Sequence, residues 1–164
     1  MRRGEGYCPE SDWLMHAVRS QMDFEHGPDA AANLARLIAL TRDAEASNRD
    51  WALLVLQQTA LDTEDVRAAL VAGLDDPDRE ARLEALIGVA KREPGRALPL
   101  VAALLAEDEI DSMTFEAAAY VADRALLPAL EAVREGIEDE DDLFDDLLAE
   151  AMACCAIQVA PDWR

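Results

Sequence analysis

Three consecutive pairs of helical segments between residues 47 and 137 constrain the fold of this chain most strongly. In the central pair, "DPDREARLEALIGVA" is followed by "EPGRALPLVAALLA", and similar pairs stand on either side at a spacing of about 29–32 residues. Each pair has the length and apolar periodicity of a helical hairpin. A repeat of this kind is typical of arrays in which each hairpin packs against the next.

The helices of these pairs are too apolar to be stable alone. The segment 98–105 carries apolar residues on all sides, so we expect neighbouring helices to cover it on more than one face. Ala, Leu and Val supply most of the 51% hydrophobic content, and aromatic residues make up only 5%, which favours helices over strands. The sequence therefore predicts an all-α fold of stacked hairpins.

A chain of 164 residues is long enough for one domain, which we expect over residues 11–164 after an N-terminal tail of residues 1–10. An irregular hairpin is predicted at 11–42, with a first helix of about Ser11–Phe24, a stop at Gly27 and a second helix from Pro28. Repeats follow at about 46–137, and one or two capping helices at 141–160. Trp163 is expected to cover the open end of the array.

The stretch "DDPDREARLEALIGVA" resembles the first helix of a HEAT repeat, in the short form found in bacterial proteins. The matching residues are Asp76, Pro77, Asp78, Ala81, Arg82, Ala85 and Leu86. Our alignment places Leu53 and Thr114 where Arg82 stands, so a regular ladder of Asp–Arg contacts is not expected. The resemblance covers roughly residues 46–137. It implies a right-handed α-solenoid (α-α superhelix) of about five stacked antiparallel helical hairpins, with an ordinary helical bundle as the alternative.

The formal net charge of −20, from 35 acidic and 15 basic residues, restricts the partners. Nucleic acids and anionic membranes are bound largely by Lys and Arg, so we predict neither as a partner. A protein with a basic surface fits this charge. The three cysteines, with Cys154 next to Cys155, and the lack of an apolar N-terminal segment predict reduced thiols in a cytoplasmic protein.

Acidic residues gather at the turns between successive hairpins. Equivalent turns lie along one edge of a stacked solenoid, so we expect these clusters to form a single acidic rim that contacts a partner. Helix capping explains about one acidic residue in each turn, and the other acidic residues of the turn remain unexplained by it. The candidate rim residues are Asp75, Asp76, Asp78, Glu107, Asp108, Glu109, Asp111, Glu138, Asp139, Glu140, Asp141 and Asp142.

The usual residue patterns of catalysis and metal binding are missing from the sequence. The stretch "EDEDDLFDDLLAE" lacks the central glycine of a calcium loop, and His16 and His26 lack the spacing of a helical zinc pair. Cys154 and Cys155 stand in an apolar helix without a nearby histidine, which is typical of buried thiols. We therefore predict no catalytic residue, no metal and no cofactor.

These features, with the HEAT resemblance, favour a non-enzymatic protein–protein interaction module, a scaffold, adaptor or inhibitor. It would bind its partner through a concave face or through the acidic rim. An immunity protein that neutralises a basic toxin such as a nuclease is an alternative, because opposite charge accelerates capture. A subunit of a lyase-type enzyme is a second alternative, and it would need a pocket with converging polar groups. We expect a monomer, or a weak homodimer formed through apolar ends.

Replacing Leu86 with Asp should abolish cooperative unfolding, because the substitution buries a charge without a partner inside the predicted stack. Thermal melting followed by circular dichroism measures this effect. A cooperative transition retained in the Leu86→Asp variant would show that the helix face assigned to the core is wrong.

Overall fold

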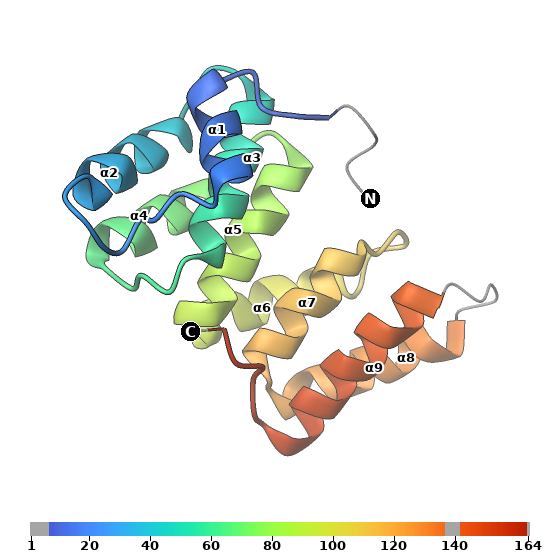
Figure 1. The fold of residues 1–164 in the computed structure, drawn as a ribbon. Helices are drawn as coiled ribbons and strands as arrows, with labels where there is room; N and C mark the ends of the chain where they lie inside the picture. Colours follow the sequence, from blue (N-terminus) through green and yellow to red (C-terminus); the bar gives the residue numbers. More distant parts are fainter. Residues whose placement is uncertain (1–6, 137–141, 164) are drawn as a thin grey trace. The chain divides into compact units, whose positions relative to one another are not determined.

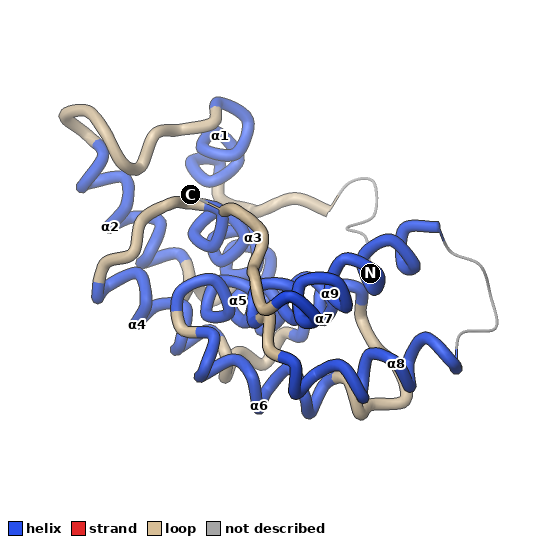
Figure 2. Tube along the Cα trace, turned by 90° about the horizontal axis from the view of Figure 1, so that it is seen from below, coloured by secondary structure: helices blue, strands red, loops and turns tan. Residues whose placement is uncertain are grey.

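The computed structural model describes residues 7–136 and 142–163, and every regular element in this part of the chain is a helix (Figures 1 and 2). The elements are α1 (Asp12–Ser20), α2 (Ala30–Leu40), α3 (Ala46–Gln58), α4 (Glu64–Gly73), α5 (Arg79–Arg92), α6 (Pro94–Leu104), α7 (Ser112–Val121), the 3-10 helix η1 (Arg124–Leu126), α8 (Leu127–Gly136) and α9 (Asp142–Ile157). None of the helices within the described ranges combines the length and the apolar character that crossing a membrane requires.

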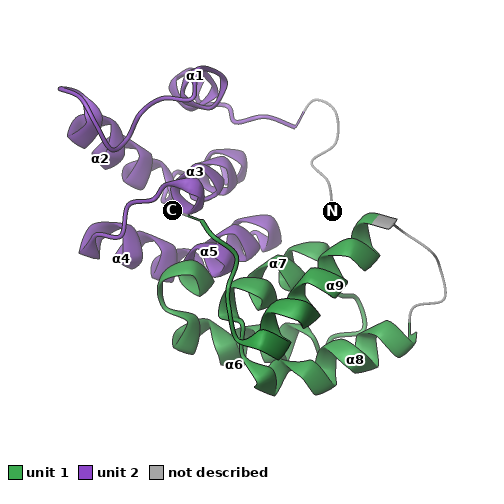
Figure 3. Ribbon diagram, turned by 60° about the horizontal axis from the view of Figure 1, so that its bottom comes forward, with its two compact units in different colours: residues 1, 89–163 green, residues 2–88, 164 purple. Residues whose placement is uncertain are grey.

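The chain divides into two compact units, coloured separately in Figure 3, and the boundary falls inside α5. The N-terminal unit is Arg2–Gly88, in which α3 packs against α1, α2 and α4. The C-terminal unit is Val89–Trp163, in which α7 packs against α6 and α9, and α8 against α9. Within each unit the helices pack against helices that are close to them along the chain, as α2 does on α3 and α7 on α9, which confirms the all-α, solenoid-like fold. The single domain expected over residues 11–164 stays a prediction.

Short polar side chains set where several helices begin. Ser11 accepts a hydrogen bond from the Leu14 N–H at 3.3 Å, and Thr63 does the same for Val66 at the start of α4. Each bond satisfies a backbone donor that has no partner inside its own helix. The sequence thus marks these starting points reliably.

The end of the first helix differs from the prediction. Helix α1 stops at Ser20 because Gln21 adopts the left-handed conformation, with φ of 49°, and its N–H bonds to the Ala17 carbonyl. Gly27, where we expected the stop, has φ of 95° within the following loop, and α2 begins at Ala30 instead of Pro28. A loop of residues 21–29 therefore replaces the last turn of the expected helix.

Two glycines allow close approach of α5 to α3 and α4 in the N-terminal unit. A Cβ atom at Gly88 would lie 2.5 Å from Leu70 Cδ2, and one at Gly73 would lie 2.8 Å from the Cβ of Ala85. Both distances are too short for any side chain. Leu86, on the same helix, is only 3% exposed, so the predicted burial of this residue is confirmed.

The core of the C-terminal unit is built around α7 and α9. Phe115 is fully buried and meets Phe144 edge to face, with ring centres 4.7 Å apart. Helix α6 buries Ala97 and Val101 but leaves Leu100 39% exposed. We expected this apolar segment to be covered on more than one face, and Leu100 marks a face that stays partly exposed to solvent.

Trp163 lies near the end of α5. The Arg92 guanidinium carbon is 4.8 Å from the centre of the indole ring, a distance typical of a cation–π contact. The tail that leaves α9 in Figure 1 thus brings this tryptophan to α5. Whether Trp163 covers the open end of the array, as expected from the sequence, stays a prediction.

A buried ion pair joins α3 to the turn before α5. Arg49 donates from Nε to Asp76 Oδ2 at 2.7 Å and from Nη2 to Asp76 Oδ1 at 2.9 Å. The two side chains are only 13% and 6% exposed. Such a two-point contact between charged groups is stronger and more directional than a single neutral hydrogen bond.

The same arginine reveals the true register of the repeat. Arg49 Nη1 donates to the Asp43 carbonyl at 3.0 Å, and Arg82 Nη1 donates in the same way to the Asp76 carbonyl at 2.6 Å. Arg49 is therefore the equivalent of Arg82, 33 residues earlier. Our alignment of Leu53 with Arg82 was wrong, and at least one Asp–Arg contact between repeats exists.

Asp76→Ala should destabilise the protein by about 3–5 kcal/mol, because it leaves the Arg49 guanidinium buried without its counter-charge. Urea unfolding measures the loss. Asp62→Ala is the matched control: its carboxylate pairs with Arg67 in the same two-point geometry, but these side chains are 25% and 46% exposed. The control should cost less than about 1 kcal/mol, and equal losses in the two variants would contradict the assigned role of the buried pair.

The Asp76 pair should also make stability depend on pH. Burial raises the pKa of this carboxyl, but the hydrogen bonds from Arg49 and from the Asp78 N–H outweigh it and hold the pKa below the ordinary 3.8. A lowered folded-state pKa gives stability that is complete above pH 3.8 and lost as the pH falls through the folded value. Between pH 6 and 3 the free energy of unfolding should fall more steeply in the wild type than in Asp76→Asn.

Candidate functional site

The first predicted acidic cluster is divided between the surface and the interior. Asp76 is buried by its pair with Arg49, and its Oδ1 also accepts from the Asp78 N–H at 2.9 Å. Asp78 in turn accepts from the Ala81 N–H at 3.0 Å, as a cap of α5. Asp75 alone in this cluster is classed as exposed. Fewer carboxylates of this cluster are therefore exposed to a partner than we expected from the sequence.

The second cluster follows α6 in the C-terminal unit. Glu107, Asp108 and Glu109 are exposed, whereas Asp111 caps α7 by accepting from the Met113 N–H at 3.0 Å. Glu138, Asp139, Glu140 and Asp141 lie outside the described residues, as does the side chain of Asp142. The described clusters belong to different units, so the continuous rim stays a prediction.

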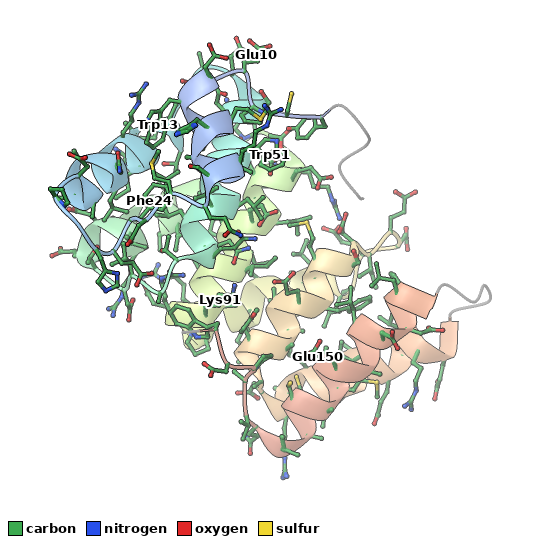
Figure 4. All side chains as sticks on the ribbon, in the orientation of Figure 1. Glu10, Trp13, Phe24, Trp51, Lys91 and Glu150 are labelled. Atoms are coloured by element: carbon green, nitrogen blue, oxygen red, sulfur yellow. The ribbon has the colours of Figure 1, made fainter. Side chains whose placement is uncertain are left out.

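A groove that the sequence did not predict lies in the N-terminal unit. It is formed by the end of α1, the loop that follows Gln21 and the second half of α3, and its volume is about 610 Å³. Phe24, labelled in Figure 4, is the buried residue of the loop. The lining residues are Ala17, Val18, Gln21, Met22, Asp23, Phe24, Glu25, His26, Leu54, Val55, Gln58 and Thr59. All of them are described, and none is a lysine or an arginine.

Two carboxylates on the groove wall are fixed by backbone hydrogen bonds. Asp23 Oδ1 accepts from the N–H groups of Glu25 and His26 at 2.8 and 2.9 Å, and these bonds hold the pKa of Asp23 below its usual range. Glu25 Oε1 accepts from the Ala60 N–H at 2.9 Å, across 35 residues of sequence. The loop therefore presents negative charge in a set position beside the apolar side chains of α1 and α3.

A second polar group gathers on α7 and α9, close to the end of α5. Lys91 Nζ lies 4.5 Å from the centre of the Tyr120 ring, and Figure 4 labels Lys91 and Glu150. Burial raises the pKa of Glu116, with Lys91 opposing this rise and Glu150 adding to it. Burial likewise raises the pKa of Tyr120 and of Cys154. A raised pKa lowers the fraction of the ionised form of the tyrosine hydroxyl and of the thiol, which does not suit a nucleophile.

The remaining candidate residues are placed as follows. His16 is exposed, and His26 has a side chain 81% exposed with Nδ1 3.6 Å from Asp23 Oδ2. Trp13 and Trp51 are half-buried, and Arg36 stacks on the Trp13 ring at 4.7 Å. Across the described ranges, no three His, Cys, Asp or Glu side chains gather closely enough to hold a metal ion.

No protein-family model matches the chain. Two curated relatives, each called protein YibA, come from Escherichia coli strain K12 and from Escherichia coli O157:H7. Both are 30% identical over 110 residues, which cover 67% of this chain and 39% of the relative. The chain thus spans about two fifths of the length of these relatives.

Solved structures show the same type of fold. The X-ray structure of Escherichia coli YibA matches 88% of this chain and 55% of its own, with a TM-score of 0.66 and 24% identity. The crystal structure of an engineered protein matches 82% of this chain and 69% of its own, with a TM-score of 0.52 and 16% identity. These similarities support the arrangement of the helices only. The roles of individual residues are therefore argued from the contacts within this chain.

The groove had a weak signal in the sequence. Asp23 stands two residues before Glu25, and an Asp side chain in a turn commonly bonds to the backbone two residues further on. The apolar periodicity of α1 obscured it, because Met22 and Phe24 extend the helical pattern beyond Ser20.

The three thiols should react at very different rates. Cys8 is exposed, whereas burial raises the pKa of Cys155 to about 11, and Cys155 Sγ donates to the Ala118 carbonyl at 3.6 Å. At pH 8 an aromatic disulfide reagent should modify one thiol per chain rapidly, and all three only in denaturant. Cys8→Ser should remove the rapid phase. A rapid phase that persists in this variant would mean that Cys154 or Cys155 is activated.

Proposed function

We propose that this chain is a HEAT-like repeat module that binds a protein with a basic surface and carries out no catalysis itself. The observation that carries the proposal is the set of exposed carboxylates at the turns, namely Asp75, Glu107, Asp108 and Glu109. Neighbouring acids at the same turns serve as helix caps or ion pairs, as Asp76, Asp78 and Asp111 do. Exposed acidic charge at these turns favours rapid encounter with a basic partner.

The HEAT-like character is supported by the repeated Asp–Arg arrangement. The Asp43–Arg49 and Asp76–Arg82 turns share two contacts: an arginine that donates to the carbonyl of the aspartate, and an aspartate that accepts from the N–H two residues later. A motif that recurs with the same hydrogen bonds indicates a structural repeat. The three free cysteines support action in a reducing compartment such as the cytoplasm.

Neutralising the exposed clusters tests the proposal. The variant carries Asp75→Asn, Glu107→Gln, Asp108→Asn and Glu109→Gln, and it should lose most of a bound partner at low salt. The matched control removes four exposed carboxylates elsewhere, with Glu64→Gln, Asp65→Asn, Glu131→Gln and Glu135→Gln. Binding is measured by crosslinking in native lysate and mass spectrometry of the crosslinked peptides, at low and at high salt.

Two outcomes would refute the proposed function. Partner recovery that is equal in the cluster variant and the control would show that these turns do not recognise the partner. A captured protein with an acidic binding surface, or one retained equally in 50 mM and 500 mM salt, would contradict the electrostatic basis, because exposed charge pairs are screened at about 8 Å in 0.15 M salt and closer still at higher salt.

A further inference from the structure

We infer that the groove of the N-terminal unit, formed by α1, the loop 21–26 and α3, binds a short protein segment that carries an apolar side chain next to a lysine or arginine. This inference rests on the proposed protein-binding function and adds a specific docking position to it. The groove contacts are separate from the acidic clusters at the repeat turns, because its lining residues come only from positions 17–26 and 54–59.

The groove floor provides apolar surface that the unit does not fully cover. Val18 on α1, Met22 in the loop, and Leu54 and Val55 on α3 are all half-buried and all line the groove. A neighbouring apolar group would remove more of this surface from water, which is the main favourable term in association. The contact requires a side chain that enters the groove, since the floor lies between two helices.

The groove wall selects for positive charge. Asp23 and Glu25 stand on the loop that closes one side, and the lining residues include no lysine or arginine to neutralise them. Each carboxylate has one oxygen engaged with backbone N–H groups, and the second oxygen of Asp23, Oδ2, lies 3.6 Å from the exposed His26 Nδ1. A carboxylate has two oxygens and about four acceptor positions, so both groups retain capacity for a guanidinium or ammonium donor.

The size and the charge of the groove set limits on its occupant. A volume of about 610 Å³ falls within the range of sites for small ligands, so it suits a short segment and not a large surface. A second copy of this chain is disfavoured, because it brings a net charge of −20 to a wall that is already acidic. A purely apolar segment would leave the two carboxylates partly dehydrated without compensation.

Three helical peptides of equal length test the inference on the full chain. The first carries leucines on one face flanked by arginines, the second replaces the arginines with glutamates, and the third replaces the leucines with alanines. Titration into the ¹⁵N-labelled protein should give saturable chemical-shift changes with the first peptide, centred on residues 17–26 and 54–59. The other two should bind at least about tenfold more weakly.

A conservative double variant tests whether the two carboxylates of the groove wall contribute to peptide binding. Asp23→Asn with Glu25→Gln removes both charges but keeps the acceptor oxygens for the backbone hydrogen bonds, so the loop should remain folded. The first peptide should bind this variant about tenfold more weakly. The control, Glu64→Gln with Asp65→Asn, removes two exposed carboxylates of α4 and should leave the affinity unchanged.

Several results would overturn the inference. These are unchanged affinity in the Asp23/Glu25 variant, equal binding of the glutamate peptide, shift changes centred outside the groove, or no saturable shift with the first peptide. The proposed function would survive such a result if the lysate partner is still lost when the turn clusters are neutralised. The converse result is that the first peptide binds in the groove while the lysate partner is recovered equally well after the turn clusters are neutralised. That result would support the groove inference and refute the proposed function.

Discussion

The buried pair of Arg49 and Asp76 is the interaction on which the N-terminal unit depends. It joins α3 to the turn before α5 through two short hydrogen bonds, and the same aspartate also accepts from the Asp78 N–H. Because Asp78 then caps α5, the start of that helix is tied to the position of α3. A charged pair removed from water stabilises only when both partners are present and well oriented. One repeat therefore fixes the beginning of the next.

This structural use of acidic residues changes how the net charge should be interpreted. Among the three aspartates of "DDPD", only Asp75 is exposed, while Asp76 and Asp78 are engaged in the ion pair and the cap. We expected all three aspartates on the acidic rim, with about one of them serving as a helix cap, because Asp is rarely buried unless it is paired. The partner of Asp76 stands 27 residues earlier, at Arg49. No local pattern around the aspartate indicates such a distant partner.

The helix type and the burial of Leu86 could be predicted because they depend on local pattern alone. The repeat register could not. Arg49 and Leu53 differ by four residues, about one helical turn, and a shift of that size leaves the apolar face almost unchanged. Only the hydrogen bonds of the arginine separate the two alignments. The groove was missed for a related reason, since the left-handed Gln21 ends α1 where the apolar pattern continues.

The exposed clusters and the groove would contribute to binding in different ways. Each exposed carboxylate adds little to affinity, because water and salt screen it, but a field of several such groups raises the association rate. Apolar contact in the groove is insensitive to salt and would mainly lower the dissociation rate. Asp23 and Glu25 would contribute to both the association rate and the groove contact, since they are charged groups beside the half-buried Val18 and Leu54. Salt should therefore weaken a partner bound at both surfaces chiefly by slowing its association.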